Sequence, residues 1–205
     1  MSTTDAEILD HVGPAFLALA DALEAAGEGI ADRPSLCEGW TVGHVIAHVT
    51  MAARYDAPAF QREVAADGYD FDVLSNRIAE RDRRRPFADL VADLRSPVMA
   101  QWTPPGGGPI GALTHVVVHG LDITEAVGLP RTADDTATTI VLKSLVTDGV
   151  AESFGRSAAL HSLYATDLDL TLGAGARIEA NAADLILALA NRPRPGVDLT
   201  AAGPR

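Results

Sequence analysis

Hydrophobic positions recur with helical spacing through the first three quarters of the chain. Ile8, Val12 and Phe16 follow one another at intervals of four, which predicts a helix over residues 4–26. Glycine- and proline-rich segments separate this stretch from others of the same kind. The same spacing predicts further helices over residues 41–66, 72–84, 86–101, 110–127 and 132–154. We therefore expect a helical bundle up to about residue 155.

The pattern changes in the last quarter of the chain. Residues 167–172 and 176–180 alternate polar and apolar side chains, which predicts two short strands joined by the glycine-rich turn 173–175. Residues 181–190 then return to helical spacing. The fold class is therefore expected to be mainly α, with two domains: a helical bundle over 1–155 and a small α+β domain over 156–205.

Composition and charge exclude some partners. The chain has 205 residues, of which 47% are hydrophobic and 21% charged, as in ordinary globular proteins. Its net charge of -12 disfavours nucleic acid or an anionic membrane as a partner, because both require a basic surface. A basic run at 81–85 is interleaved with acidic residues, which is typical of a solvated helix end.

Three features predict a cytoplasmic protein. Cys37 is the sole cysteine, so no disulfide can form within the chain, which fits a reducing compartment. The first residues lack the basic and apolar regions of a signal peptide. No apolar run approaches the length of a membrane span.

Two histidine pairs are the strongest chemical signal. His44 and His48, and likewise His115 and His119, are four residues apart, so each pair lies on one face of a predicted helix. Imidazole is the commonest metal ligand among side chains, and two facing helices can supply three or four ligands to one ion. The alternative is that these histidines are hydrogen-bonded side chains of the core.

Neighbouring residues support some chemistries and exclude others. Asp122 lies three residues after His119 and is expected to accept a hydrogen bond from its free imidazole nitrogen; the alternative is a surface aspartate. Val45 and Val116 stand where a zinc peptidase of the His-Glu-x-x-His type carries its glutamate, so peptidase chemistry is disfavoured. No nucleophile elbow or phosphate-binding loop is present. Nothing nearby in sequence lowers the pKa of Cys37, so a nucleophilic role is disfavoured.

Three segments together carry a family resemblance that covers nearly the whole chain. Residues 36–49 resemble the Cys-x-Gly-Trp-Thr-Val-x-x-x-x-x-His-Leu stretch of the mycothiol-dependent maleylpyruvate isomerase-like family. Residues 118–123 are similar to its second motif, Val-His-Gly-x-Asp-Ile. Residues 165–192 resemble its small C-terminal domain, although Asn191 replaces the usual glycine before Arg192. The resemblance implies a DinB-like metal-binding four-helix bundle with a small α+β C-terminal domain.

The resemblance also implies a three-ligand site. His48 matches the first ligand and His119 the last, while His115 takes a position where relatives carry Glu, Asp or His. His44 matches no ligand and is expected to line the pocket or to cap the helix start. Three histidines leave an open position for water or substrate, as catalytic metal sites do.

The implied activity is that of a divalent-metal-dependent isomerase or S-transferase, in which a thiol is activated for attack on a small electrophile. Zn²⁺ is the first expectation for the metal, with Ni²⁺, Fe²⁺ or Mn²⁺ as alternatives, and mycothiol is the expected thiol. Arg192 either reaches an anionic substrate or interacts with a helix C-terminus, and Trp40 either walls the pocket or anchors its loop. No further catalytic residue is predicted.

Two other functions stay open at this point. One is a non-catalytic DinB-like module that binds metal or has lost it. The other is a metal-dependent hydrolase in which water fills the open position. The expected partners are a small-molecule thiol and an electrophilic substrate, and assembly into a homodimer is left open.

Overall fold

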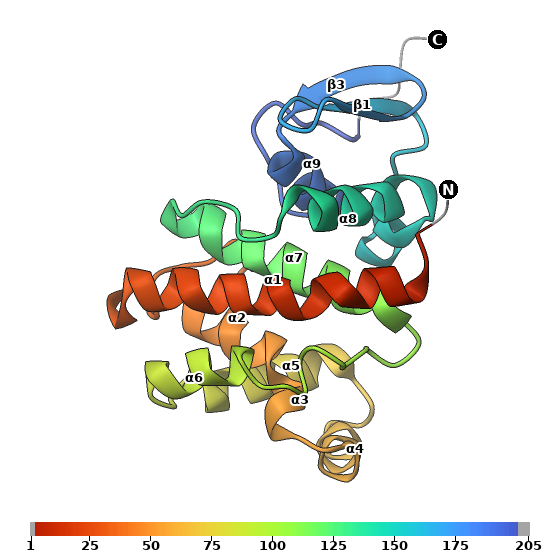
Figure 1. Ribbon diagram of the computed structural model, residues 1–205. Helices are drawn as coiled ribbons and strands as arrows, with labels where there is room; N and C mark the ends of the chain where they lie inside the picture. The colour runs from red at the N-terminus through yellow and green to blue at the C-terminus, as the bar shows by residue number, and fades with distance from the viewer. Residues whose placement is uncertain (1–2, 201–205) are drawn as a thin grey trace.

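The computed structural model describes residues 3–200, with helices through most of the chain and a small sheet near its end (Figure 1). The mainly α class with a small α+β portion is confirmed. Within residues 3–200, no helix combines the length and apolar character needed to cross a membrane. The elements are α1 (Asp5–Ala26), η1 (Glu28–Ile30), α2 (Val42–Val49), α3 (Met51–Arg54), α4 (Ala57–Ala66), α5 (Phe71–Asp82), α6 (Phe87–Leu94), α7 (Gly108–Val127), α8 (Asp135–Thr147), η2 (Val150–Phe154), β1 (His161–Ala165), β2 (Leu170–Gly173), β3 (Ala176–Ala180) and α9 (Ala182–Leu189).

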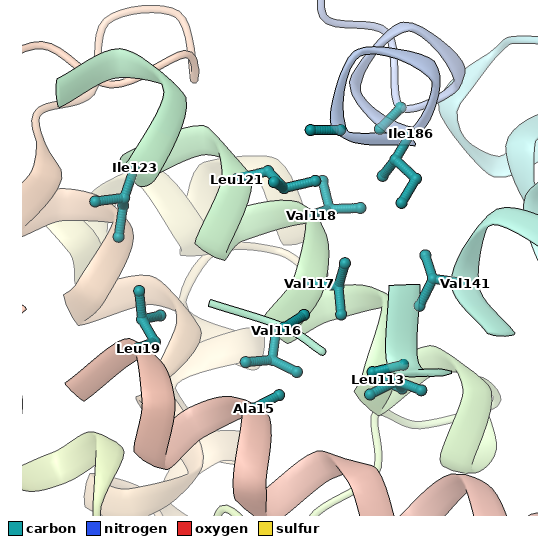
Figure 2. Close-up of a cluster of buried hydrophobic side chains, with 14 of the residues drawn as sticks. Ala15, Leu19, Leu113, Val116, Val117, Val118, Leu121, Ile123, Val141 and Ile186 are labelled. Atoms are coloured by element: carbon teal, nitrogen blue, oxygen red, sulfur yellow. The ribbon is translucent and has the colours of Figure 1, made fainter. Parts of the chain in front are cut away.

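Helix α7 lies at the centre of the core. Its Val116 lies toward Leu19 of α1, and its Val117 lies toward Val141 of α8 (Figure 2). Ile186 of α9 lies above the same cluster. One buried cluster therefore includes residues on both sides of position 155, and the division into two domains stays a prediction.

Helix α1 begins and ends where its sequence predicts. The Thr4 hydroxyl accepts the Glu7 backbone N–H at 3.3 Å, and the Glu7 carboxylate accepts the Thr4 N–H at 2.7 Å. This reciprocal cap satisfies two N–H groups that the helix itself cannot pair. Gly27, with φ 81°, ends the helix.

The single helix expected over residues 41–66 is wrong, because the chain forms three helices there. Thr50 separates α2 from α3, and Tyr55 is extended, with φ -117° and ψ 112°. The Asp56 side chain then accepts the N–H of Ala59 and caps α4, whose first turn contains Pro58. The cap and the proline favour a new helix start over continuation.

Two other predicted helices are shorter than expected. The one expected over 86–101 ends at Leu94, shortly before Pro97, which cannot continue it. The one expected over 132–154 ends at Thr147, and Gly149 then takes a left-handed φ of 75°. In both cases the apolar spacing continues past the residue that breaks the helix.

The C-terminal sheet has a strand that the sequence pattern did not predict. β1 lies between β2 and β3, antiparallel to β2 and parallel to β3. The two predicted strands therefore exist but do not pair with each other. The connection between them passes the end of β1: a Cβ at Gly175, whose φ is 123°, would lie 2.1 Å from the carbonyl oxygen of Leu160. This close approach requires glycine.

Candidate metal centre

Packing of α2 against α7 brings three histidines together. His48 lies on α2, and His115 and His119 lie on α7. The ring centroids are 5.1 Å apart for His48 and His115, and 4.9 Å apart for each pair that includes His119. One nitrogen from each ring lies within 4.8 Å of the others. The structure thus assembles the three side chains that the sequence analysis singled out as ligands.

The distance between His48 and His115 fits a shared cation. Their Nε2 atoms are 3.1 Å apart. Two nitrogens bound tetrahedrally to one zinc ion at about 2.0–2.1 Å would be separated by about 3.3–3.4 Å, so a small outward movement of the rings would admit the ion. Burial, and secondarily the neighbouring imidazoles, hold the pKa of both side chains well below the usual value. Both rings are therefore neutral, which is the form that binds metal.

The other nitrogens of these two rings are unsatisfied. Within residues 3–200, the buried Nδ1 atoms of His48 and His115 have no hydrogen-bond partner. Buried polar atoms are nearly always paired in native proteins, so each exception calls for an explanation. If these histidines served only to stabilise the core, their Nδ1 atoms would be expected to have hydrogen-bond partners. In a metal site, the free energy gained by binding the cation offsets the cost of burying unpaired Nδ1 atoms.

Asp122 holds His119 in one tautomer. Its side chain is 0% exposed, so the alternative of a surface aspartate is wrong. Burial raises its pKa, but hydrogen bonds from His119 and Arg192 outweigh burial and lower the pKa to about 2. The ionised Oδ2 lies 2.9 Å from Nδ1 of His119, which must therefore carry the proton. Nε2 of His119 is left as the ligand atom.

Arg192 lies behind His119 and is paired with a buried carboxylate. It donates to both oxygens of Asp122, at 2.9 and 2.8 Å. Asn191 precedes it with φ 64°, a left-handed conformation that glycine adopts freely and that asparagine tolerates better than most other residues. The replacement of the family's glycine therefore preserves the turn that directs Arg192 inward.

Cys37 belongs to the same network as a hydrogen-bond donor. Burial first, and then the charge of Asp122, raises the pKa of the thiol to about 12, so the group stays protonated and donates to Oδ2 of Asp122 at 3.0 Å. Cys37, His119 and Asp122 form a second group with metal-ligand spacing. Arg192 already supplies a cation there, since its guanidinium lies 3.5 Å from Sγ of Cys37 and pairs with Asp122.

His44 is placed apart from the other three histidines. Its Nδ1 accepts the N–H of Thr41 at 3.1 Å, which caps the start of α2, and its Nε2 lies 2.8 Å from Oε2 of Glu80. The helix begins tightly against the preceding loop, because the Gly43 N–H donates to the carbonyl oxygen of Ala31 at 2.8 Å. A Cβ at position 43 would lie 3.2 Å from that oxygen.

Three aromatic rings border the histidine cluster. Trp40 lies 5.1 Å from His48 and also donates from Nε1 to Asn76 at 2.8 Å, so it both borders the site and anchors its loop. Trp102 lies 5.5 Å from His115, and Phe71 lies 6.4 Å from His48. Sequence reasoning missed Trp102 and Phe71, although aromatic residues make up only 5% of the chain and could have been examined individually.

The described cavities lie elsewhere. One of about 860 Å³ lies among the start of α1, α8 and the turn after β1. A second, of about 230 Å³, adjoins Arg192 on the side of the C-terminal segment. Neither is lined by the three clustered histidines, and the chemistry of the donor atoms, rather than cavity size, identifies the candidate site.

Comparison with known proteins supports the family resemblance. Residues 12–101 match the family model of the mycothiol maleylpyruvate isomerase N-terminal domain, which confirms the resemblance carried by the motif around Trp40 and His48. That match ends before His115 and His119. Two solved structures, titled as the mycothiol-dependent maleylpyruvate isomerase and a mutant of it, each match with 18% identity, a TM-score of 0.45 and 100% of both chains covered. No curated protein matches the chain.

Proposed function

We propose that this chain, whose residues 12–101 belong to the mycothiol maleylpyruvate isomerase N-terminal domain family, is a divalent-metal-dependent enzyme that uses a thiol to isomerise or modify a small electrophile. His48, His115 and His119 are the proposed ligands. Zn²⁺ is the proposed metal, because three imidazoles with an open position suit it. Mycothiol is the proposed thiol, on the strength of the family.

The observation that carries the proposal is the convergence of three imidazoles, one nitrogen of each lying within 4.8 Å of the others, with two of the rings leaving a buried nitrogen unpaired. A protein interior does not retain such a cluster for stability, since burying unpaired polar atoms costs about 1–3 kcal/mol each. When bound, a divalent ion would lower the pKa of a thiol or water in its open position.

The chain's own residues orient the site and limit access of water. Asp122 fixes the tautomer of His119, and Arg192 holds Asp122 in its ionised form. Such carboxylate partners of ligating histidines typically raise metal affinity 10–100-fold. Trp40 and Trp102 cover two of the imidazoles, so that a reactant entering the site leaves bulk water.

The proposed reaction balances without an oxidant or reductant. In isomerisation, a thiolate adds to one carbon of a double bond, the remaining single bond rotates, and the thiolate leaves as the double bond re-forms in the other geometry. In S-transfer, the carbon–sulfur bond persists and the carbanion takes up a proton. Both outcomes follow from one addition step, so the first assay should follow thiol and alkene separately.

The test begins with metal. Purified protein is titrated with Zn²⁺ at neutral pH, and bound metal is measured by elemental analysis together with Co²⁺ absorption spectra. We expect about one tightly bound ion per chain. Failure to bind added zinc would overturn the proposal.

The second step separates the reaction types. Zinc-loaded protein is incubated with mycothiol and a cis-alkene, while thiol loss, alkene geometry and hydrolysis products are recorded. Thiol-dependent turnover that disappears in His115→Ala and persists in His44→Ala supports the proposal. Hydrolysis without thiol supports the hydrolase instead, and bound zinc without any turnover supports a non-catalytic module.

A further inference from the structure

Arg156 is a half-buried cation without a carboxylate partner. It follows η2, and its Nε donates to the side-chain oxygen of Asn191 at 2.9 Å. Within residues 3–200, neither of its terminal nitrogens, Nη1 and Nη2, meets an acceptor. The net charge of the chain is -12, so acidic side chains are plentiful, yet none pairs with this guanidinium in the described residues. Its terminal N–H groups can therefore bind an external anion.

Arg194 carries a further unused donor beside the same cavity. Both arginines line the cavity of about 230 Å³ at the end of α9. Arg194 donates from Nε to Asp184 and from Nη2 to Glu125, the latter at 2.8 Å. Its Nη1 has no acceptor in the part of the chain that the structure describes. Three arginines and one acidic residue, Asp198, are among the described lining residues, so the cavity carries an excess of positive charge.

Arg192, the third arginine, separates this cavity from the histidine cluster. Its Nε and Nη2 donate to Asp122, which in turn binds His119, and its Nη1 donates to the carbonyl oxygen of Ala190. No histidine is among the described residues that line the cavity. The unused donors of Arg156 and Arg194 therefore belong to a site distinct from the candidate metal centre.

Asn191 orients Arg156 in a way that glycine could not. The family's usual glycine at this position has no side-chain oxygen to accept the Nε N–H. Asn191 keeps the left-handed turn, with φ 64°, and adds that acceptor. Because Nε is held, the outer edge of the guanidinium, formed by Nη1 and Nη2, is left for a second partner that accepts two parallel N–H bonds.

Size and charge together indicate the ligand. A cavity of about 230 Å³ is smaller than the roughly 300–1,000 Å³ of sites for drug-sized molecules, so the ligand is small. Guanidinium groups bind carboxylates and phosphates through paired N–H bonds. A phosphate has more acceptor oxygens than a carboxylate, so it can accept from two arginines at once.

We infer that Arg156 and Arg194 bind a phosphate group, either as the free ion or as the end of a small monoester. Nη1 and Nη2 of Arg156 donate to two of its oxygens, and Nη1 of Arg194 donates to a third. No covalent bond forms or breaks. The inference goes beyond the proposed function and requires neither metal nor thiol.

Phosphorus NMR measures binding directly. Metal-free protein is used, because a zinc ion would itself attract phosphate. The line width of inorganic phosphate, and separately of glycerol phosphate, is recorded over a range of concentrations at an ionic strength held constant with sodium chloride. We expect saturable binding at one site per chain, half-saturated at or below about 1 mM. Binding of glycerol phosphate supports the site and shows that it accepts monoesters, whereas binding of inorganic phosphate alone identifies the free ion. Absence of saturable binding by both would overturn the inference.

A charge deletion with a matched control tests Arg156. Arg156→Gln should raise the half-saturating phosphate concentration about tenfold or more, because a charge-assisted pair of hydrogen bonds is lost. Arg62→Gln removes the same charge from an exposed position on α4 and should change it less than about twofold. Equal effects of the two substitutions would mean general electrostatic attraction and would overturn the site. Zinc affinity of Arg156→Gln, measured without phosphate, should stay within about threefold of wild type, and a larger loss would contradict the separation of the two sites.

A second substitution tests the contribution of Asn191. Asn191→Gly restores the family's residue in a conformation that glycine adopts freely, so the turn is retained. We expect phosphate affinity to fall about threefold or more, because Arg156 loses the acceptor that orients it. Circular dichroism verifies the fold, and unchanged phosphate affinity would contradict the role of Asn191.

Discussion

Two buried polar clusters adjoin α2, and they differ in how their atoms are satisfied. At its C-terminal end, Arg54 donates to Asp82, Asp93 and the Thr50 hydroxyl, and Tyr55 donates to Asp82 at 2.6 Å. On its face toward α7, three imidazoles meet and two of their nitrogens have no partner. The first cluster is complete as it stands, whereas the second leaves the Nδ1 atoms of His48 and His115 unpaired.

Polar residues that hold the core together differ from those that bind a ligand in whether their buried atoms are paired within the chain. A satisfied network of charges holds elements together and is costly to break, because each lost partner leaves a buried charge. An unsatisfied cluster costs stability and persists where a ligand offsets that cost. Substitutions in the Arg54 cluster should therefore change the free energy of unfolding, whereas substitutions in the histidine cluster should change metal affinity.

The largest effect is expected from His115→Ala. Zinc sites with four ligands bind with about 10–16 kcal/mol, or about 2.5–4 kcal/mol per ligand, so the loss of one ligand should weaken zinc binding by about a hundredfold or more. Competition with a chromophoric chelator measures this. His44→Ala is the matched control and should change zinc affinity by less than about threefold. A large loss in His44→Ala would show that the ligand assignment is wrong.

Breaking the satisfied cluster around Asp82 should lower the free energy of unfolding by about as much as His115→Ala lowers the free energy of zinc binding. Asp82→Ala removes the buried carboxylate shared by Arg54 and Arg81 and leaves Arg54 with Asp93 alone, and we expect a loss of about 3 kcal/mol in the free energy of unfolding, measured by urea denaturation of metal-free protein. Asp32→Ala removes a carboxylate that is 91% exposed and should cost less than about 0.5 kcal/mol. A cost below about 1 kcal/mol for Asp82→Ala would remove the contrast between the clusters.

A smaller effect on zinc affinity is expected from substitution of Asp122, which is hydrogen-bonded to the proposed ligand His119. Asp122→Asn keeps the size of the side chain but weakens its hold on the His119 tautomer, and it should lower zinc affinity about 10–100-fold. The same chelator competition measures it, with circular dichroism to verify the fold. Unchanged affinity would show that Asp122 serves only to bind Arg192.

The smallest expected effect is the pH dependence of the stability that Asp82 contributes. Burial raises the pKa of Asp82, but hydrogen bonds from Tyr55 and Arg81 and the charge of Arg54 outweigh burial and lower it. Because the folded pKa lies below the unfolded value of about 3.9, this stabilisation is present above that value and is lost as pH falls further. The stability gap between wild type and Asp82→Asn should therefore narrow as pH falls below about 4 in urea titrations. A constant gap would contradict this linkage.

Local signals predicted the elements well where caps and periodicity agree. Helix α1 follows its pattern from the Thr4 cap to Gly27, and α9 begins after Asn181. The long helix expected over 41–66 failed because the spacing of apolar residues continues through Thr50 and Tyr55, where the chain leaves the helical conformation. The strand order failed because β1, with the sequence His-Ser-Leu-Tyr-Ala, was not predicted, and it lies between the two strands that were.

The sequence by itself determined that four histidines stand in pairs on helices, because a four-residue spacing places side chains on one helical face wherever that helix lies. Only the tertiary structure decided which of them meet. His44 and His48 share a face of α2. Thr41 and Glu80 bind His44. The packing of α7 brings His115 and His119 to His48. Helical periodicity fixes direction around an axis, and contact between two helices requires the packing of the whole core.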